Sequence, residues 1–466
     1  MAEPSAAKSL PSLAWPLVIS FTMRSLLTSI DIPYGAMLGD SAVAAIGLFF
    51  PLEFLFIACW VGASTALTSH LSHAMGERHE GRVAQLVQVT GRLAAALMAV
   101  FLALAALVWL LSDRLGLEPA VAADFGVYAP LAMAGIATFG FWSVVPDSIV
   151  KAHHDTVSTM IAGLISGVTN LGLNTLFVLG FGWGIVGIAL ATGLARTASL
   201  TYALYRARRL ERARKAAWTT EAPPRARRAP RATFTSEGLF SRPYAALLAL
   251  GIPSALTFSL KAAEGFVVNA VLTRLEQATA AIAAYAIYHR ASLLMLMPVF
   301  ATGVAVLPFM ARAVGEGRYD EVRHGLRQAF LLSAGYLLLI TAPLCVFAAE
   351  PIAALLGNRE ETRELATLAI RYGVPLAALA SAPFALCRPA FEALQRGTPG
   401  LVMGALRYLV LSVPLALLGL WLAARTGAEP FLGVLAGLIG GTAIVSAVFT
   451  VWLVRTVRVL GREEPA

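Results

Sequence analysis

A few charged and polar residues lie inside long apolar stretches of this sequence, and they are the candidates for chemistry. Asp31 lies about two helical turns from the end of its stretch. Because burial in an apolar medium raises the pKa of a carboxyl group, such an acid can exchange a proton near neutral pH. Asn170 and Asn174 are four residues apart and share one face of a helix, and Thr192 lies in the following stretch. Asp31 is either a proton-exchanging group or a structural carboxylate bonded to neighbouring helices.

Five other charged residues lie deep in apolar stretches, and three of them are basic: Arg24, Glu53, Lys261, Glu264 and Arg290. A charge inside a bilayer is costly, so it is usually either paired or functional. One interpretation is that these residues neutralise one another in pairs, Arg24 with Glu53 in particular. Under the other, their surplus positive charge faces a cleft and binds an anionic or zwitterionic substrate, unless Lys261 gives up its proton.

The histidines and the remaining motifs indicate little further chemistry. His153 and His154 are adjacent and point in different directions on a helix, which argues against a metal site, whereas His289 lies deep enough to relay protons. Asp147 precedes Lys151 by one turn, which predicts an ion pair at a helix end. The sequence contains no glycine-rich phosphate loop with its lysine and no nucleophile motif. We therefore expect no enzyme activity, no cofactor and no ATP-driven pumping.

The composition places these residues in a membrane protein. Of the 466 residues, 58% are hydrophobic and 14% are charged, and the mean hydropathy is +0.73. Soluble domains are near 45–50% apolar and about 25% charged, so a soluble chain of this composition could not cover its own surface with polar groups. The three cysteines lie in apolar runs and suggest neither disulfides nor a metal site: Cys59, Cys345 and Cys387.

The apolar runs predict an all-α membrane protein with twelve transmembrane helices. A spanning helix needs about 20 mostly apolar residues. Runs bounded by glycine, proline or charge meet this length at 13–37, 42–69, 86–111, 125–150, 157–180, 185–205, 244–272, 279–311, 327–349, 363–391, 400–424 and 430–454.

The distribution of basic residues predicts the topology. Residues 206–242 hold eleven Lys and Arg against three Glu, and this segment accounts for most of the net charge of +9. Basic residues are enriched in cytoplasmic loops, and the pattern fits when both termini are cytoplasmic. We therefore expect a multi-pass protein of the cell (inner) membrane. The basic segment is then a cytoplasmic linker that could touch anionic lipid, and we expect no nucleic-acid partner.

The linker separates two halves that resemble each other. "LAWPLVISFTMR" precedes "AMGERHEGRV" in the first half, and "LALGIPSALTFSLK" precedes "AVGEGRYDEV" in the second. An offset of 237 residues aligns Pro16 with Pro253, places Arg24 on Lys261, and places Glu53 on Arg290. Six spans in each half make the repeats parallel, so we predict two pseudo-symmetric lobes around a central cleft, an arrangement suited to alternating access. The predicted division is 1–205 for the N-lobe, 206–243 for the linker and 244–466 for the C-lobe.

Nearly the whole chain resembles the multidrug and toxic compound extrusion (MATE) family of cation-coupled antiporters. The local matches are "SIDIPYGAMLGDSAVAAIG" in the first span and "GVTNLGLNTLFVLGFGWGIVGIALAT" across the fifth and sixth spans. By this resemblance Asp31 is the cation-coupling acid of the N-lobe, and Asn170, Asn174 and Thr192 are its polar partners. The family often has an acid at the position of Asn174. Because this chain has an asparagine there, Asp31 is the single carboxylate of the matched set. The resemblance therefore favours protons over sodium as the coupling ion.

The C-lobe departs from the pattern of sodium-coupled members. Those members carry one acid in the seventh span, where this chain has Lys261. They carry another in the tenth span, at a position that falls on or near Ala385 in this chain. A sodium site of that kind is not expected here.

Three functions are compatible with these features. The first is a secondary exporter of small organic compounds that is driven by proton influx and acts as a monomer. The second is a flippase for a lipid-linked anionic substrate, although such relatives often have fourteen spans. The third is a membrane-embedded acyl- or glycosyl-transferase, which the internal repeat disfavours.

Overall fold

The described secondary structure of this protein is entirely helical in the computed structural model, which describes residues 9–27, 31–114, 117–220, 242–356 and 359–460. The elements of the first half of the chain are α1 (Leu10–Leu27), α2 (Asp31–Leu38), α3 (Asp40–Gly76), α4 (Glu80–Leu111), the 3-10 turn η1 (Ser112–Arg114), α5 (Pro119–Ala152), α6 (Thr156–Asn174), the π-helical η2 (Thr175–Gly180) and α7 (Gly184–Thr220). Those of the second half are α9 (Pro243–Leu272), α10 (Ala278–Gly315), α11 (Tyr319–Tyr336), η3 (Leu337–Thr341), α12 (Ala342–Leu356), α13 (Glu360–Leu368), η4 (Ala369–Gly373), α14 (Val374–Ala393), α15 (Thr398–Ala405), η5 (Leu406–Leu411), α16 (Ser412–Thr426) and α17 (Pro430–Val459).

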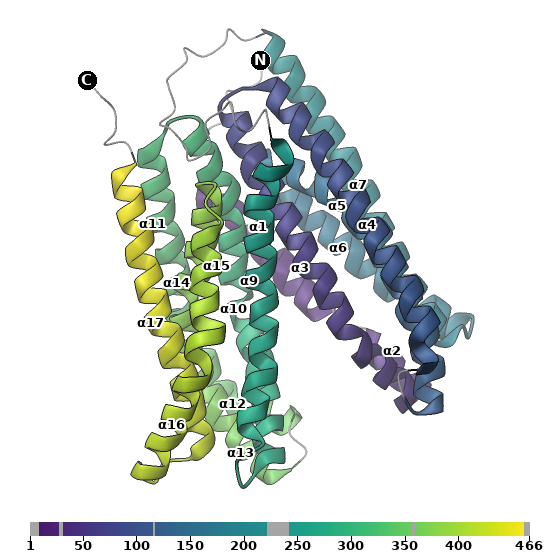
Figure 1. Ribbon diagram of the computed structural model, residues 1–466, viewed down its shortest axis with the longest axis vertical. Coiled ribbons are helices and arrows are strands. Elements are labelled where there is room, and N and C mark those ends of the chain that lie inside the picture. Colours follow the sequence, from purple (N-terminus) through teal and green to yellow (C-terminus); the bar gives the residue numbers. More distant parts are fainter. Residues whose placement is uncertain (1–8, 28–30, 115–116, 221–241, 357–358, 461–466) are drawn as a thin grey trace. The chain divides into compact units, whose positions relative to one another are not determined.

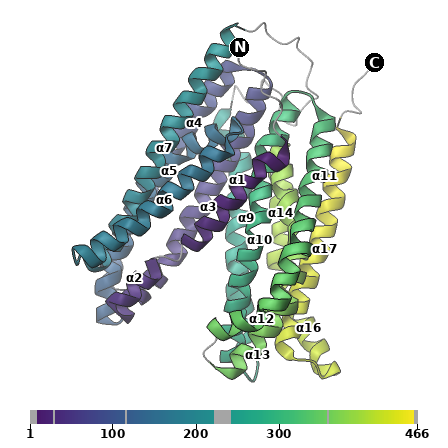
Figure 2. The same cartoon turned by 180° about the vertical axis from the view of Figure 1, so that it is seen from behind.

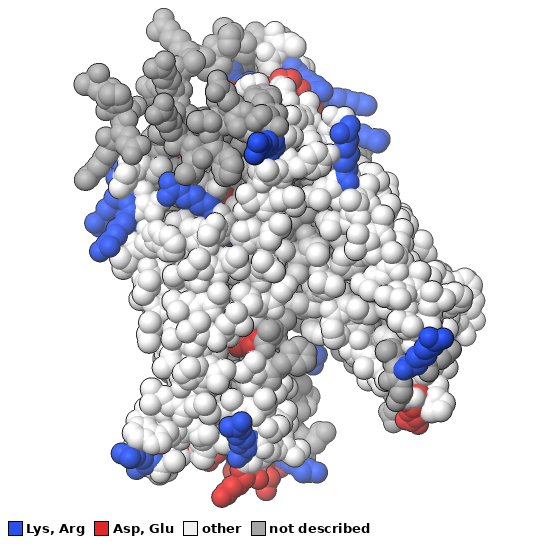
Figure 3. Space-filling model, viewed as in Figure 1, with Lys and Arg blue, Asp and Glu red and all other residues white. Residues whose placement is uncertain are grey.

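The predicted membrane architecture is confirmed. Eleven helices in the described part of the chain are long and apolar enough to cross a membrane, and a shorter apolar helix covers Leu10–Thr22. The first predicted span, 13–37, corresponds to α1 and α2 on either side of residues 28–30. On the face drawn in Figure 3, the middle stretches of the helices are almost free of charged side chains, whereas blue and red side chains gather near the helix ends. The chain is therefore an all-α, multi-pass membrane protein.

Four of the spans contain a π-helical turn that the apolar pattern does not predict. These turns are η2, η3, η4 and η5, and each continues directly from one α-helix into the next or into the following turn. A π turn inserts one extra residue into a helix, changes the direction of the following side chains and is often found at functional sites. Two of them, η2 and η5, adjoin the candidate residues described below.

The described residues divide into two compact units, of which the first comprises Ser12–Ala255 with Ala311–Gly317. In this unit α5, α6 and α7 run side by side (Figures 1 and 2). Its core contains three phenylalanines that pack edge to face, with ring centroids 4.8 Å apart for Phe56 and Phe141 and 5.2 Å apart for Phe101 and Phe141. These rings fix α3, α4 and α5 against one another. The lobe boundaries inferred from the repeat stay a prediction.

The first unit also holds Gly76 and Gly315, which correspond to each other in the repeated motifs "AMGERHEGRV" and "AVGEGRYDEV". A Cβ atom on Gly76 would lie 2.6 Å from the carbonyl oxygen of Arg312, and one on Gly315 would lie 2.4 Å from that of His73. Only glycine permits this approach of the backbones of α3 and α10.

The second unit comprises Leu256–Met310 and Arg318–Ala466 with Ser9–Pro11, and of these the residues up to 460 at the C-terminal end are described. Phe391 of α14 and Phe449 of α17 stack with centroids 5.2 Å apart. The backbones of α16 and α17 approach closely, because a Cβ on Gly437 would lie 1.9 Å from the carbonyl oxygen of Leu415. Close packing of small residues replaces the hydrophobic effect as the force that joins helices in a bilayer.

Candidate functional site

Three helices of the first unit bring the predicted coupling residues together. Asp31 is the first residue of α2, Asn170 and Asn174 lie in the last two turns of α6, and Thr192 lies in the third turn of α7. Asn174 is the residue at which α6 passes into the π-helical η2. The spacing of four between the two asparagines places both on the face of α6 that meets α7.

The four side chains form one hydrogen-bonded cluster. Asn174 Nδ2 donates to Asp31 Oδ1 at 2.8 Å, and Thr192 Oγ1 donates to Asp31 Oδ2 at 3.1 Å. Asn170 joins both partners, because its Oδ1 accepts from Asn174 Nδ2 at 3.3 Å and its Nδ2 donates to Thr192 Oγ1 at 3.3 Å. Each carboxylate oxygen of Asp31 therefore faces a donor, which is the arrangement that suits an ionised acid.

The amide of Asn174 gives this cluster a second possible arrangement. Asn174 is fully buried, and its Oδ1 has no hydrogen-bond partner among the described residues. An ionised carboxylate only accepts hydrogen bonds, whereas a protonated one also donates. A half-turn of the Asn174 amide would present its oxygen to a protonated Asp31, so that the same side chain can serve both protonation states.

Two residues beside the cluster were not predicted. Tyr34 lies one turn after Asp31 in α2, and its hydroxyl is 2.6 Å from Thr175 Oγ1. Because Thr175 Oγ1 donates to the carbonyl of Leu171 at 2.9 Å, Tyr34 is the donor of the shared bond. This contact ties α2 to η2 directly beside the bond between Asp31 and Asn174.

Glu53 of α3 pairs with a residue that the sequence analysis did not consider. Its carboxylate lies 3.8 Å from Arg196 Nη2, and the Arg196 guanidinium carbon lies 5.6 Å from the ring centroid of Phe56. Arg196 is one helical turn after Thr192 in α7. The signal that could have identified Arg196 is that it is a cation inside the predicted span 185–205. The side chain of Arg24, the predicted partner of Glu53, lies outside the described residues.

In the second unit, two of the predicted deep charges lie in one cluster. Glu264 of α9 accepts a hydrogen bond of 2.6 Å from Ser412 Oγ. Lys261 Nζ lies 5.0 Å from the ring centroid of Phe300, and its charge is within electrostatic range of Arg407, Glu264 and Arg388. Arg388 and Arg407 were missed, although both lie inside predicted spans and were visible as intramembrane cations.

The other two deep residues of this half lie side by side in α10. His289 and Arg290 are both exposed, and the His289 ring is 6.1 Å from that of Tyr285. His289 lies within electrostatic range of Lys261. An imidazole is thus within electrostatic range of the lysine, as a proton relay would need.

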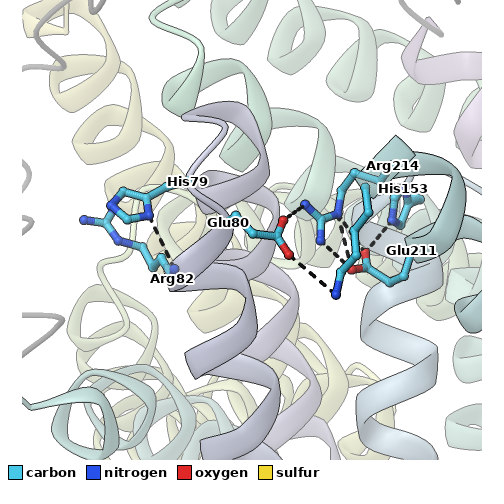
Figure 4. Close-up of polar contacts among 7 residues, drawn as sticks. His79, Glu80, Arg82, His153, Glu211 and Arg214 are labelled. Atoms are coloured by element: carbon cyan, nitrogen blue, oxygen red, sulfur yellow. Dashed lines mark hydrogen bonds and ion pairs between the residues drawn. The ribbon is translucent and has the colours of Figure 1, made fainter. Parts of the chain in front are cut away.

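In the first unit, a separate network of charges joins α4, α5 and α7 (Figure 4). Arg214 of α7 contacts Glu80 of α4, and its Nη2 is 2.6 Å from Glu211 Oε2. His153 donates to Glu211 at 2.8 Å, so its ring is committed to a carboxylate. The described residues contain no group of three or more His, Cys, Asp or Glu side chains that could hold a metal.

Two further ion pairs lie within α5 and between the start of α6 and α7. Lys151 Nζ lies 2.5 Å from Asp147 Oδ2, which confirms the pair predicted from their spacing. Arg206 Nε lies 2.7 Å from Asp155 Oδ2.

Comparison with known proteins identifies the family. A family model described as MatE matches residues 16–176 and 253–418. A probable multidrug resistance protein, YoeA of Bacillus subtilis (strain 168), is 24% identical over 340 residues, which are 71% of this chain and 69% of that protein. An FAD transporter of Shewanella oneidensis is 24% identical over 409 residues, 82% of this chain and 81% of that protein.

The fold agrees with the sequence comparison. A solved structure described as the outward-facing conformation of a multidrug resistance MATE family transporter of the MOP superfamily has a TM-score of 0.81 and 20% sequence identity, covering 98% of this chain and 97% of that one. The family model matches well over half of the residues, in two segments that correspond to the two halves of the repeat. The chain therefore belongs to the MatE family of multidrug and toxic compound extrusion proteins, and it is a membrane transporter and not an enzyme.

Proposed function

We propose that this protein exports small organic compounds by alternating access and couples their export to the entry of protons at Asp31. The observation that carries this proposal is the pair of hydrogen bonds from Asn174 and Thr192 to the Asp31 carboxylate. The other three members of the cluster are neutral, so that a single proton neutralises it.

Protonation of Asp31 changes what holds α2 against its neighbours. In the ionised state, both carboxylate oxygens accept from side chains of α6 and α7. After protonation, one oxygen becomes a donor and its bond to Asn174 Nδ2 or Thr192 Oγ1 must be exchanged. Charge-assisted hydrogen bonds are about twice as strong as neutral ones, so the protonated form is held more weakly. This difference lets a proton gradient shift the balance between two conformations.

The donor set favours protons over sodium. A hard cation is bound by several oxygen ligands, usually with more than one carboxylate. Of the three side chains that join Asp31 in this cluster, two are asparagines, and their amide N–H groups donate to Asp31, Asn170 and Thr192. An N–H donor cannot serve as a ligand of a cation. Lys261 stands where sodium-coupled members of the family carry an acid in the second half.

The proposed substrates are anionic or zwitterionic organic compounds. Arg24, Glu53, Lys261, Glu264 and Arg290 are the residues that we propose to contact them. The proposal is supported by the cations that surround Lys261 and by the similarity to a protein named an FAD transporter, since FAD carries a negatively charged pyrophosphate. The alternative is a flippase for a lipid-linked anionic substrate, which would use the same cations.

The orientation and the surroundings of the protein belong to the same proposal. Both termini lie in the cytoplasm, the protein resides in the inner membrane as a monomer, and the basic segment 206–242 faces anionic lipid. Export then corresponds to movement away from the side of the termini.

Transport by proteoliposomes tests the proposal. The purified protein is reconstituted, a pH gradient is imposed, and the uptake of anionic, zwitterionic and cationic compounds is compared in the absence of sodium. We expect uptake of anionic or zwitterionic compounds that collapses when the pH gradient is removed. Translocation of a labelled anionic lipid, without transport of any soluble compound, would support the flippase instead. Transport that needs ATP or sodium would contradict the proposal.

A further inference from the structure

Arg407 is an intramembrane arginine that the sequence motifs do not assign to a site. It lies in the π-helical η5, within the predicted eleventh span, and its side chain is partly exposed. The guanidinium carbon lies 4.8 Å from the ring centroid of Tyr408 and 5.3 Å from that of Phe384. Its Nε is buried and has no hydrogen-bond partner within the described part of the chain.

Two contacts fix the segment around Arg407 against α9. A Cβ on Gly404 would lie 2.9 Å from Thr257 Cγ2, so the two helices touch at this point. Two turns further along both helices, Ser412 Oγ donates to Glu264 at 2.6 Å. Both contacts advance in the same chain direction, as expected for the parallel seventh and eleventh spans.

The space between these two contacts is where Lys261 and Arg407 lie. Lys261 is one turn after Thr257 in α9, and Arg407 is about one turn after Gly404 on the other helix. Consistent with this register, the charges of Lys261 and Arg407 act on each other. Arg407 is therefore a cationic neighbour of Lys261 that the repeat does not indicate.

The π turn accounts for the position of Arg407. Between the two contacts, α9 advances from residue 257 to 264, whereas the other helix advances from 404 to 412 and so contains one residue more. A π turn absorbs such an extra residue and is frequent at functional sites. Ser412 Oγ also lies 2.9 Å from the carbonyl oxygen of Arg407, which the wide turn leaves available.

The charges around Lys261 and Arg407 do not balance. Arg388 donates to Glu392 at 3.0 Å, so this acid is already engaged. Among the described residues, Glu264 is the acid that acts on the charge of Lys261, and it also accepts from Ser412. One acid thus serves two cations, and an uncompensated cation inside a membrane protein is expensive. The aromatic rings stabilise both cations from the side but cannot neutralise them.

We propose that Lys261 and Arg407 form an oxyanion site that binds the phosphate or carboxylate group of the transported compound. Arginine presents a planar set of N–H donors that matches the oxygens of either group. The rings of Tyr408 and Phe384, with centroids 4.8 and 5.3 Å from the guanidinium carbon, stabilise its charge in place. The inference rests on the proposed transport function and specifies its substrate class: an organic compound with a terminal oxyanion.

A matched pair of flavins tests the site in the purified, full-length protein. FMN and riboflavin share one fluorescent ring system, and FMN alone carries a phosphate. Binding is measured by fluorescence polarisation in detergent, without any ion gradient. We expect FMN to bind about 10- to 100-fold more tightly than riboflavin, the range set by one charge-assisted hydrogen-bonding partner.

The variants localise this preference. Arg407→Met and Lys261→Met should each reduce FMN binding to the level of riboflavin, and Arg407→Lys should restore part of it. Arg425→Met is the matched control, because Arg425 also lies over an aromatic ring, at 4.2 Å from Trp421, but is exposed at the end of α16. Size-exclusion chromatography confirms that each variant is folded, and the two independent methionine variants guard against a folding failure in one.

The anion could come from a soluble compound or from a lipid headgroup. Phosphatidylglycerol and phosphatidylcholine are therefore compared in nanodiscs as competitors or as ligands. Binding of phosphatidylglycerol that depends on Arg407, without binding of FMN, keeps the oxyanion site and assigns it to lipid. The inference is overturned if FMN and riboflavin bind equally tightly. It is also overturned if neither FMN nor phosphatidylglycerol shows binding that depends on Arg407.

The result is separable from the proposed coupling mechanism. Asp31→Asn should bind FMN as the unsubstituted protein does, because Asp31 belongs to the first unit and the assay uses no gradient. Absence of pH-driven transport by the unsubstituted protein, with FMN binding that depends on Arg407, would refute the proposed function alone. Intact proton-driven transport with binding indifferent to Arg407 would refute the oxyanion site alone.

Discussion

Asp155 offers a stability test of the helix pair that presents the coupling residues. It is the N-cap of α6, where its Oδ1 accepts from the backbone N of Ser158 at 3.2 Å and its Oδ2 from Ser158 Oγ at 2.7 Å. Arg206 Nε of α7 donates to the same Oδ2 at 2.7 Å. One carboxylate therefore starts α6 and fastens it to α7, the two helices whose far ends hold the partners of Asp31.

The expected loss can be worked out from these contacts. A side-chain N-cap stabilises by about 1 kcal/mol, and a hydrogen bond to a charged group by about 1.5–3 kcal/mol when it is buried. The Arg206 side chain is 29% exposed, which reduces the second value. Asp155→Ala, which removes all three bonds, should cost about 2–3 kcal/mol. Asp155→Asn keeps an oxygen for the cap and should cost about 1–2 kcal/mol.

The pH dependence gives the test its sign. Burial raises the pKa of Asp155, but the hydrogen bonds from Ser158 and Arg206 and the charge of Arg206 together hold this pKa below its usual range. The unfolded chain then binds a proton at a higher pH than the folded protein, so the carboxylate stabilises the fold above the unfolded pKa of about 3.9. The difference between the unsubstituted protein and Asp155→Asn should be constant near neutral pH and should shrink as the pH falls below about 4.

The unfolding rate in detergent at a fixed temperature measures this loss, because large membrane proteins seldom unfold reversibly. A loss of about 1–2 kcal/mol corresponds to about 5- to 30-fold faster unfolding if the contact is broken in the transition state. Asp320→Asn is the control: its pair with Arg323, at 3.1 Å, has a 99% exposed acid and should change the rate little. Equal effects of the two substitutions, or an Asp155→Asn effect that persists unchanged at about pH 3, would refute the reasoning.

Three further outcomes follow from the same contacts. Asn174→Leu removes the 2.8 Å donor to Asp31 and should slow pH-driven transport in proteoliposomes about 10- to 100-fold, while an unchanged rate would remove Asn174 from the mechanism. A double-mutant cycle of Glu53→Gln and Arg196→Gln should give a coupling energy of about 1 kcal/mol in the free energy of activation for unfolding, because both side chains are about one quarter exposed. Additive effects of the two substitutions would show that the 3.8 Å contact does not stabilise the protein. Transport under a pH gradient in sodium-free buffer should equal that with sodium, and a strict need for millimolar sodium would show that other oxygen ligands complete a cation site.

The sequence predicts the fold well because the bilayer restricts it strongly. A segment in lipid must satisfy every backbone group internally, so long apolar runs can only be helices, and all twelve predicted spans coincide with helical segments. The π turns could not be predicted in this way. The stretch 406–411 is apolar apart from Arg407, and its extra residue is visible only when the contacts of Gly404 and Ser412 with α9 are compared.

The candidate sites were predictable where the residues stand out by chemistry. Asp31, Asn170, Asn174 and Thr192 lie on three helices and form one hydrogen-bonded cluster, as the motifs suggested. The ion-pair partners were harder, because the repeat offset aligns positions and not contacts. Glu53 pairs with Arg196, which lies more than 140 residues away in the sequence, and such a pairing depends on how α3 and α7 pack.

Exchange and gradient-driven transport by Asp31→Asn test the central claim most directly. Asparagine resembles the protonated acid in shape and charge, so the variant can still bind substrate and reorient but cannot release a proton. In proteoliposomes loaded with a transported compound, exchange of labelled for unlabelled compound should continue at a measurable rate. Accumulation driven by a pH gradient should fall to the level of empty vesicles. Full accumulation by Asp31→Asn, with an unchanged response to the pH gradient, would contradict the assignment of proton coupling to Asp31.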